Sequence, residues 1–313
     1  MRATILDGMK YDRPMRVSAA LVCLAACNLT DRIAGNDDID ARPTQSPFDA
    51  PPRGRCPDPP AGVSEASIRV IDAINDTRRA MGIPCATLVP ALNVSSEKHC
   101  AYYVANAGTD CVDDPHAEVP GCALFVGAHF RTREELAGYQ GTPASEVMAF
   151  GGGVTGLGGL ELWANSVWHR TPLFSPWIND HGYGETAGCS NMDFGVGTPA
   201  PDDVVVTYPY PGQTGVPRDF DGSRELPSPG DLTWPSGYPI TIYLRDGSLA
   251  DPLFTVDGSD SPIAHVWITP QSSGGLLRDA FVILPELPLA PGTRYRVRAT
   301  GSVSLDFSFT VAP

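Results

Sequence analysis

The amino-acid sequence predicts two folded parts, a layered α/β domain followed by an all-β domain of the sandwich type. In the first part, apolar residues recur at helical spacing, as Ile71, Ile74 and Met81 show. From about Val204 onward, short alternating apolar runs are separated by turns rich in Gly and Pro, which is typical of antiparallel strands. A length of 313 residues suits two modest domains with extended ends.

Acidic residues outnumber basic ones by 36 to 22, which gives the chain a net charge of −14 and a pI near 4.7. The electrostatic field of this negative charge repels the phosphate backbone of nucleic acids, and no stripe of basic residues compensates for it locally. We therefore expect no nucleic-acid partner. Apolar residues make up 42% of the chain, which is enough for a packed core.

The N-terminal region has the organisation of an export signal. A basic start at Met15-Arg16 leads into an apolar run that is too short to span a bilayer and suits a signal peptide over residues 1–27. The end of this run, Leu24-Ala25-Ala26-Cys27, resembles the lipobox of bacterial lipoproteins, which implies acylation of Cys27 and a lipid anchor in the membrane. We therefore expect an exported protein, either an outer-membrane lipoprotein or a cell-surface protein. Ordinary cleavage nearby is the alternative, and Met1 and Met15 are both candidate starts of translation.

Residues 28–61 are rich in Pro and acidic side chains and predict a disordered tether. Beyond the signal region the chain carries an even set of six cysteines without a CxxC pair. In an exported protein this favours three disulfides over a zinc-ribbon or redox site. All fifteen pairings remain open, although a bond between the two cysteines that bracket His116 would restrain the loop that presents it. The six candidates are Cys56, Cys85, Cys100, Cys111, Cys122 and Cys189.

In the first part, helical spacing predicts a helix from about residue 63 to 82, a second over 89–107, and further helices around 133–137 and 160–167, with strands at 181–186 and 190–195. In the second part, alternation predicts strands at 204–208, 240–244, 265–269, 280–284, 293–299 and 305–311, in a sandwich of about seven strands.

Several segments of the first part, taken in order, resemble the signatures of bacterial CAP (SCP-like) domains, the superfamily of cysteine-rich secretory, antigen 5 and pathogenesis-related proteins. The resemblance spans residues 62–198. It rests on Asn75 to Gly82, Asp114-Pro115-His116, Ala137 to Tyr139 with Ser145 to Ala149, Trp163 to Arg170, and His181 to Gly184.

The resemblance implies an α-β-α sandwich with a cavity in which His116, Glu146 and His169 converge. Two histidines and one carboxylate with an open fourth position suit zinc or a similar divalent metal. Ser166 stands where many members have a second glutamate, and Glu161 could replace it if the helix turns it inward. The alternative is a hydrogen-bonded polar cavity that catalyses nothing.

Residues 199–313 are expected to form a Pro- and Gly-rich connection and a β-sandwich domain. The stretch Leu289 to Val297 resembles the L-x-P-G-T-x-Y-x-V turn of immunoglobulin- or fibronectin-like modules, in which Tyr295 would be a tyrosine corner. The single histidine of this part, His265, is expected to be structural.

Three functional hypotheses follow. The leading one is a non-enzymatic, envelope-anchored protein that binds a small ligand, a divalent metal or a partner protein, such as an envelope component, through His116, Glu146 and His169. The second is a metal-dependent hydrolase of envelope polymers or peptides that uses the same three residues. The third is a scaffold or adhesin that acts through its β-sandwich domain.

Overall fold

The structure is a computed structural model that describes residues 55–313. The predicted signal peptide, most of the predicted tether and the lipidation site at Cys27 lie outside these residues. The first part of the fold contains helices α1 (Glu65–Met81), α2 (Pro90–Ala105), η1 (Asp110–Val112), α3 (Phe130–Leu136), α4 (Leu157–Ala164) and α5 (Arg170–Phe174), and strands β1 (Thr87–Leu88), β2 (Thr142–Phe150), β3 (Asp180–Thr186) and β4 (Cys189–Val196).

Helix α1 begins and ends where the sequence predicts. The Ser64 side chain accepts a hydrogen bond from the Ser67 amide, which satisfies one of the free N–H groups of the first turn. Gly82 ends the helix in the left-handed conformation, at φ 74°, where the lack of a Cβ avoids strain. The buried side includes Val70, Ile71 and Ile74, so the predicted helical face is the one that packs.

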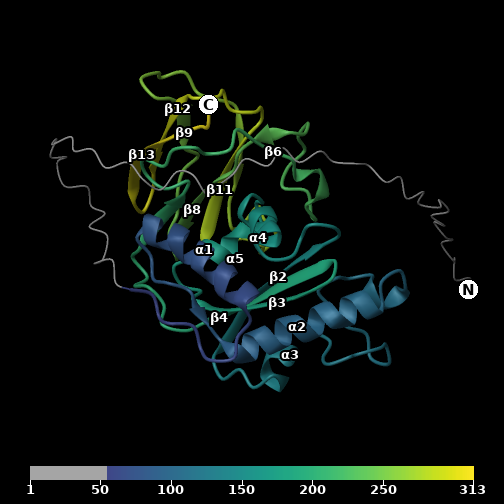
Figure 1. The fold of residues 1–313 in the computed structure, drawn as a ribbon. Coiled ribbons are helices and arrows are strands. Elements are labelled where there is room, and N and C mark those ends of the chain that lie inside the picture. Colours follow the sequence, from purple (N-terminus) through teal and green to yellow (C-terminus); the bar gives the residue numbers. More distant parts are fainter. Residues whose placement is uncertain (1–54) are drawn as a thin grey trace, which may run out of the picture. The chain divides into compact units, whose positions relative to one another are not determined.

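The first part is a three-layer α/β/α arrangement around a sheet of strand order β1-β3-β4-β2, in which only the β1–β3 pair is parallel. In Figure 1, α1, α4 and α5 lie on one side of this sheet and α2 and α3 on the other. Strand β3 shows why both sides are covered. Gly182 and Gly184 face α2, whose backbone would collide with a Cβ at either position. Tyr183 points the other way and its ring meets Trp163 of α4.

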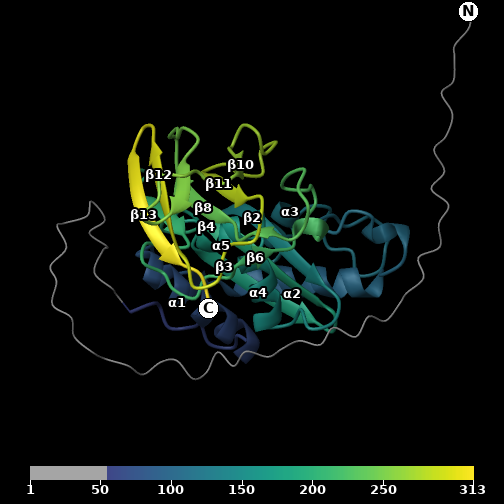
Figure 2. The ribbon, with the colours of Figure 1, turned by 90° about the horizontal axis from the view of Figure 1, so that it is seen from above.

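The second part contains strands β5 (Val205–Tyr208), β6 (Asp219–Phe220), β7 (Ser236–Gly237), β8 (Ile240–Leu244), β9 (Leu253–Val256), β10 (His265–Ile268), β11 (Ala280–Pro285), β12 (Arg294–Thr300) and β13 (Ser304–Thr310), with a short helix η2 (Gly222–Arg224). Seven of these strands form two sheets, a four-stranded sheet of order β10-β11-β8-β5 and a three-stranded sheet of order β13-β12-β9. Figure 2 shows β12 and β13 as a long antiparallel hairpin.

These two sheets enclose one apolar core that includes Ile242, Phe281, Phe254 and Phe307. Tyr295 lies in the same core, and its hydroxyl accepts a hydrogen bond of 2.7 Å from the Ala290 amide, as a tyrosine corner requires. The second part is therefore built of two packed antiparallel sheets. Its likeness to an immunoglobulin or fibronectin module stays a prediction.

The four-stranded sheet is buried on both faces. One face lies on the core just described, while Tyr243 and Val282 belong to a second apolar core that they share with α1, α4 and α5. Every residue of β8 is buried for this reason, although its apolar and polar residues alternate in the sequence. Arg170, at the start of α5, is fully buried against the rings of Tyr208 and Tyr238, at 5.1 and 4.5 Å from their centroids. The domain boundary predicted at residue 198 thus has continuous packing across it.

All six predicted cysteines are paired, which confirms the disulfide prediction. Cys56 bonds Cys85, Cys100 of α2 bonds Cys189 of β4, and the two cysteines that bracket His116 are joined to each other, as Cys111–Cys122. Within residues 55–313, no helix has the length and apolar content needed to cross a membrane.

Candidate functional site

The centre of the candidate site is a pair formed by His116 and Glu146. His116 lies in the loop between α2 and α3, and Glu146 lies on β2 with its side chain turned toward the layer of α2 and α3. The imidazole Nδ1 lies 2.9 Å from Glu146 Oε1. The carboxylate is buried, with 1% of its side chain exposed, whereas 44% of the histidine side chain is exposed. The pair therefore has a buried inner member and an outer member that reaches solvent.

Glu146 is held in its ionised form by the groups around it. Arg133 of α3 donates a short hydrogen bond to Oε2, and the amide of Asn191 donates to the same oxygen at 3.4 Å. Burial raises the pKa of Glu146, but the hydrogen bond from His116 and the nearby charges of His99 and Arg133 outweigh burial and lower it. The site thus contains a buried negative charge.

The same negative charge acts on His116. Burial lowers the pKa of this imidazole, whereas the hydrogen bond to Glu146 and the charges of Glu146 and Asp114 raise it by more, so the net pKa lies above the ordinary value of 6.5. His116 consequently keeps its second proton to a higher pH than a free histidine does.

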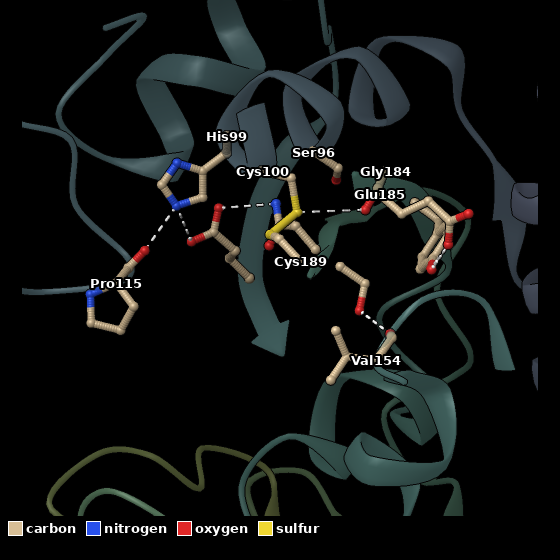
Figure 3. The surroundings of a disulfide bond; sticks show 12 residues. Ser96, His99, Cys100, Pro115, Val154, Gly184, Glu185 and Cys189 are labelled. Atoms are coloured by element: carbon tan, nitrogen blue, oxygen red, sulfur yellow. Dashed lines mark hydrogen bonds and ion pairs between the residues drawn. A yellow bond between two sulfur atoms is a disulfide. The ribbon is translucent and has the colours of Figure 1, made fainter. Parts of the chain in front are cut away.

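Two further groups, Glu118 and His99, lie behind the pair. Glu118 is fully buried and accepts hydrogen bonds from the amides of Val126 and Gly127, at 2.6 and 3.2 Å. Its other oxygen lies 2.9 Å from Nδ1 of His99, a buried histidine of α2 that Figure 3 shows beside the Cys100–Cys189 disulfide. These contacts tie both ends of the His116 loop to the interior.

Two buried acids, Glu134 and Asp193, complete the cluster. Burial, together with the charge of Glu146, raises the pKa of Glu134 to about 8. Burial, together with the charges of Glu146 and Glu134, raises the pKa of Asp193 well above its ordinary value. Near neutral pH Glu134 is therefore mainly protonated, and burial disfavours the charged form of Asp193 as well, so Glu146 is the charged partner of His116.

His169 does not join this cluster. It precedes α5, in the helical layer on the face of the sheet opposite to α2 and α3, and its Nδ1 lies 3.1 Å from Oε1 of Glu225, in the second part of the fold. Glu225 also accepts hydrogen bonds from the amides of Val167 and Trp168. The prediction that three polar groups converge is therefore realised for His116 and Glu146 only, because the sheet separates His169 from them.

The two secondary candidates lie with α4 and the turn that follows it. Ser166 is buried, and its hydroxyl contacts both the backbone amide and Nδ1 of His169, at 2.9 and 3.2 Å. Glu161 is exposed on α4, so the helix does not turn it inward. Neither residue contacts the pair formed by His116 and Glu146.

The arrangement does not fit the zinc site that the sequence suggested. His116 uses Nδ1 to bond Glu146, whose two oxygens are already engaged by His116 and Arg133. Among residues 55–313, no three side chains of His, Cys, Asp or Glu are placed to share one metal ion. A zinc centre needs three or four such ligands around one point.

Sequence reasoning did not include His99, Glu118, Arg133, Glu134 and Asp193 among the site residues. These residues are scattered over almost a hundred positions, and no shared motif connects them. A weak signal existed for Glu118, which lies two positions after His116. Charged residues in a seven-residue helix such as α3 show no periodicity from which burial can be inferred.

No protein-family model and no curated protein matches the chain. Among solved structures, an extracellular protein containing an SCP domain from Bacillus anthracis str. Ames is similar to it, with 18% sequence identity and a TM-score of 0.36. The match covers 42% of this chain and 40% of that protein, so this chain spans less than half the length of its neighbour. A TM-score of this size carries no argument about function.

Proposed function

We propose that this chain is an exported, CAP-type binding protein without enzymatic activity, in which His116 contacts an anionic oxygen of a small ligand or envelope component. The observation that supports the proposal is the pair itself. A buried carboxylate holds one ring nitrogen of a histidine whose side chain is partly exposed.

The chemistry of the pair favours an anionic ligand. The Nδ1–H group of His116 donates a hydrogen bond to Glu146, and within the described part of the chain no partner bonds Nε2. Because the pKa of His116 is raised, Nε2 carries a proton below that pKa and donates a charge-assisted hydrogen bond to a carboxylate or phosphate oxygen. Affinity for such a group should be highest below the raised pKa and should fall as pH rises through it.

Two observations support a protein that binds rather than catalyses. The donor set does not fit a metal centre, so the metal-dependent hydrolase has no support from the site. Ser166 and Glu225 both contact Nδ1 of His169, whereas a serine relay needs the hydroxyl and the carboxylate on different ring nitrogens.

Anion titration followed by NMR tests the binding proposal. The full chain, labelled with ¹⁵N-histidine, is titrated with acetate and with inorganic phosphate at pH 6.5 and pH 8. We expect a saturable shift of the His116 ring signals that is stronger at pH 6.5 and absent from His116→Gln. His265, which already bonds Asp251, is the internal reference. An equal shift of His265, no shift of His116, or a response of His116 to zinc alone would each overturn the proposal.

Export and anchoring form the second part of the proposal. Three disulfides over residues 55–313 are typical of a protein that folds in an oxidising compartment. The lipobox-like segment implies acylation of Cys27, which would hold the chain on a membrane, and the residue after the cysteine, Asn28, favours the outer membrane or the cell surface.

Metabolic labelling with a radioactive fatty acid tests the anchor in a bacterial host. The full chain should incorporate label and sediment with membranes, and Cys27→Ser should lose both properties. Cys23→Ser, four residues earlier in the same apolar run, is the matched control and should behave like the unchanged chain. Label that persists in Cys27→Ser would refute lipidation at this cysteine.

A further inference from the structure

The hydrogen bonds of His99 define where its protons are. The ring is fully buried on α2, with Nε2 2.9 Å from the carbonyl oxygen of Pro115 and Nδ1 2.9 Å from Oε1 of Glu118. Figure 3 shows the ring pointing toward Pro115. A carbonyl oxygen has no hydrogen to give, so Nε2 must be the donor in the first of these bonds.

The second bond requires a proton on Nδ1 as well. The other oxygen of Glu118 accepts two backbone amides, and the guanidinium of Arg133 lies 3.8 Å from Oε1. These donors favour the ionised carboxylate, which can only accept hydrogen bonds. The negative charge of Glu146, 3.7 Å from Nε2, favours a positive charge on the His99 ring. His99 therefore donates from both nitrogens and is an imidazolium.

We propose that the His99 imidazolium and the Glu118 carboxylate form a buried ion pair that positions His116. His99 holds Pro115, the residue directly before His116, and Glu118 holds Val126 and Gly127 at the far end of the loop. Arg133 donates to the carbonyl of His116 itself, at 3.4 Å.

The loop is thus fixed on both sides of the residue whose ring must meet Glu146. His99 and Glu118 are positioning residues, because they act on a ligand only through His116. This inference names the groups that support the proposed binding residue, so its functional part rests on the proposed function. The charge state of His99 is independent of the proposed function.

Two measurements on the full chain test the inference separately from ligand binding. The first is the ¹⁵N spectrum of the His99 ring at pH 7.5, where free imidazole is mostly neutral. We expect both ring nitrogens to carry protons in the unchanged chain and Nδ1 to lose its proton in Glu118→Gln. A single protonated ring nitrogen in the unchanged chain would overturn the ion pair, whatever the protein binds.

The second measurement is the affinity for inorganic phosphate at pH 6.5. We expect Glu118→Gln to weaken it about tenfold, the effect of losing one well-placed interaction. Glu97→Gln, which removes the same charge from an exposed position two residues before His99, should leave it unchanged. Equal affinities in the two variants would refute the positioning role. If the unchanged chain binds no phosphate, the proposed function fails, while the ring spectrum still decides the charge state.

Discussion

Replacing Glu134 by Gln should stabilise the protein near neutral pH and leave its stability unchanged in mild acid. Both carboxylate oxygens are buried, and neither has a hydrogen-bond partner among residues 55–313. Burial and the neighbouring Glu146 raise the pKa of this group from 4.5 to about 8. Between these values the native state keeps a proton that the unfolded chain has lost, so the free energy of unfolding falls as pH rises.

The size of the effect follows from the same two values. Their difference, about 3.5, corresponds to about 5 kcal/mol of stability that is complete below pH 4.5 and lost as pH rises through 8. Solvent penetration and relaxation reduce such figures, so at pH 8 we expect Glu134→Gln to be more stable than the unchanged chain by about 1 to 3 kcal/mol.

Urea unfolding at pH 4.5, 6.5 and 8, with the disulfides intact, measures this difference. The control is Glu135→Gln, which removes an exposed carboxylate from the next position of α3. The gain in Glu134→Gln should grow with pH, and the control should show no comparable trend. A difference that is the same at all three pH values, or that reverses at pH 8, would refute the assignment of a protonated Glu134.

Three further variants test contacts that hold the fold together. Replacing both cysteines of Cys100–Cys189 by Ala should lower the free energy of unfolding by about 4 to 5 kcal/mol. The same replacement at Cys111–Cys122 should lower it by about 3 kcal/mol. The difference arises because the first disulfide closes a loop with a sequence separation of 89 residues and the second one of 11. Urea midpoints of the two double variants give the comparison, and equal losses would contradict this account. Glu225→Gln should cost about 1 to 2 kcal/mol by weakening the hydrogen bonds that Glu225 accepts from the amides of Val167 and Trp168. Thermal unfolding measures the loss, and an unchanged midpoint would contradict it.

The elements that the sequence predicts well have local signals. Ser64 and Gly82 mark the ends of α1 by capping chemistry that needs no tertiary contact. Alternation likewise identifies β8, yet it cannot show that Tyr243 faces a second core. Strand β2, which carries Glu146, was not predicted as a strand, because Thr142–Phe150 shows no simple alternation and pairs with β4, almost fifty residues away.

The candidate site was predicted in part, for a similar reason. The structure brings together His116 and Glu146, each of which lies in a segment that resembles the CAP pattern. His169 lies in the segment that matches that pattern closely, but its neighbour, Glu225, comes from beyond the region of resemblance. A motif indicates where a residue lies along the chain and does not identify the partners that a later part supplies.

The sheet β10-β11-β8-β5 also limits how this gene can be rearranged. One face of this sheet packs against α1, α4 and α5. A recombination event that removed residues 204–313 would therefore expose the apolar side chains of these helices to water, which favours aggregation. The same event would strip Glu225 from the start of α5. The two parts therefore depend on each other for folding, because each covers apolar side chains of the other.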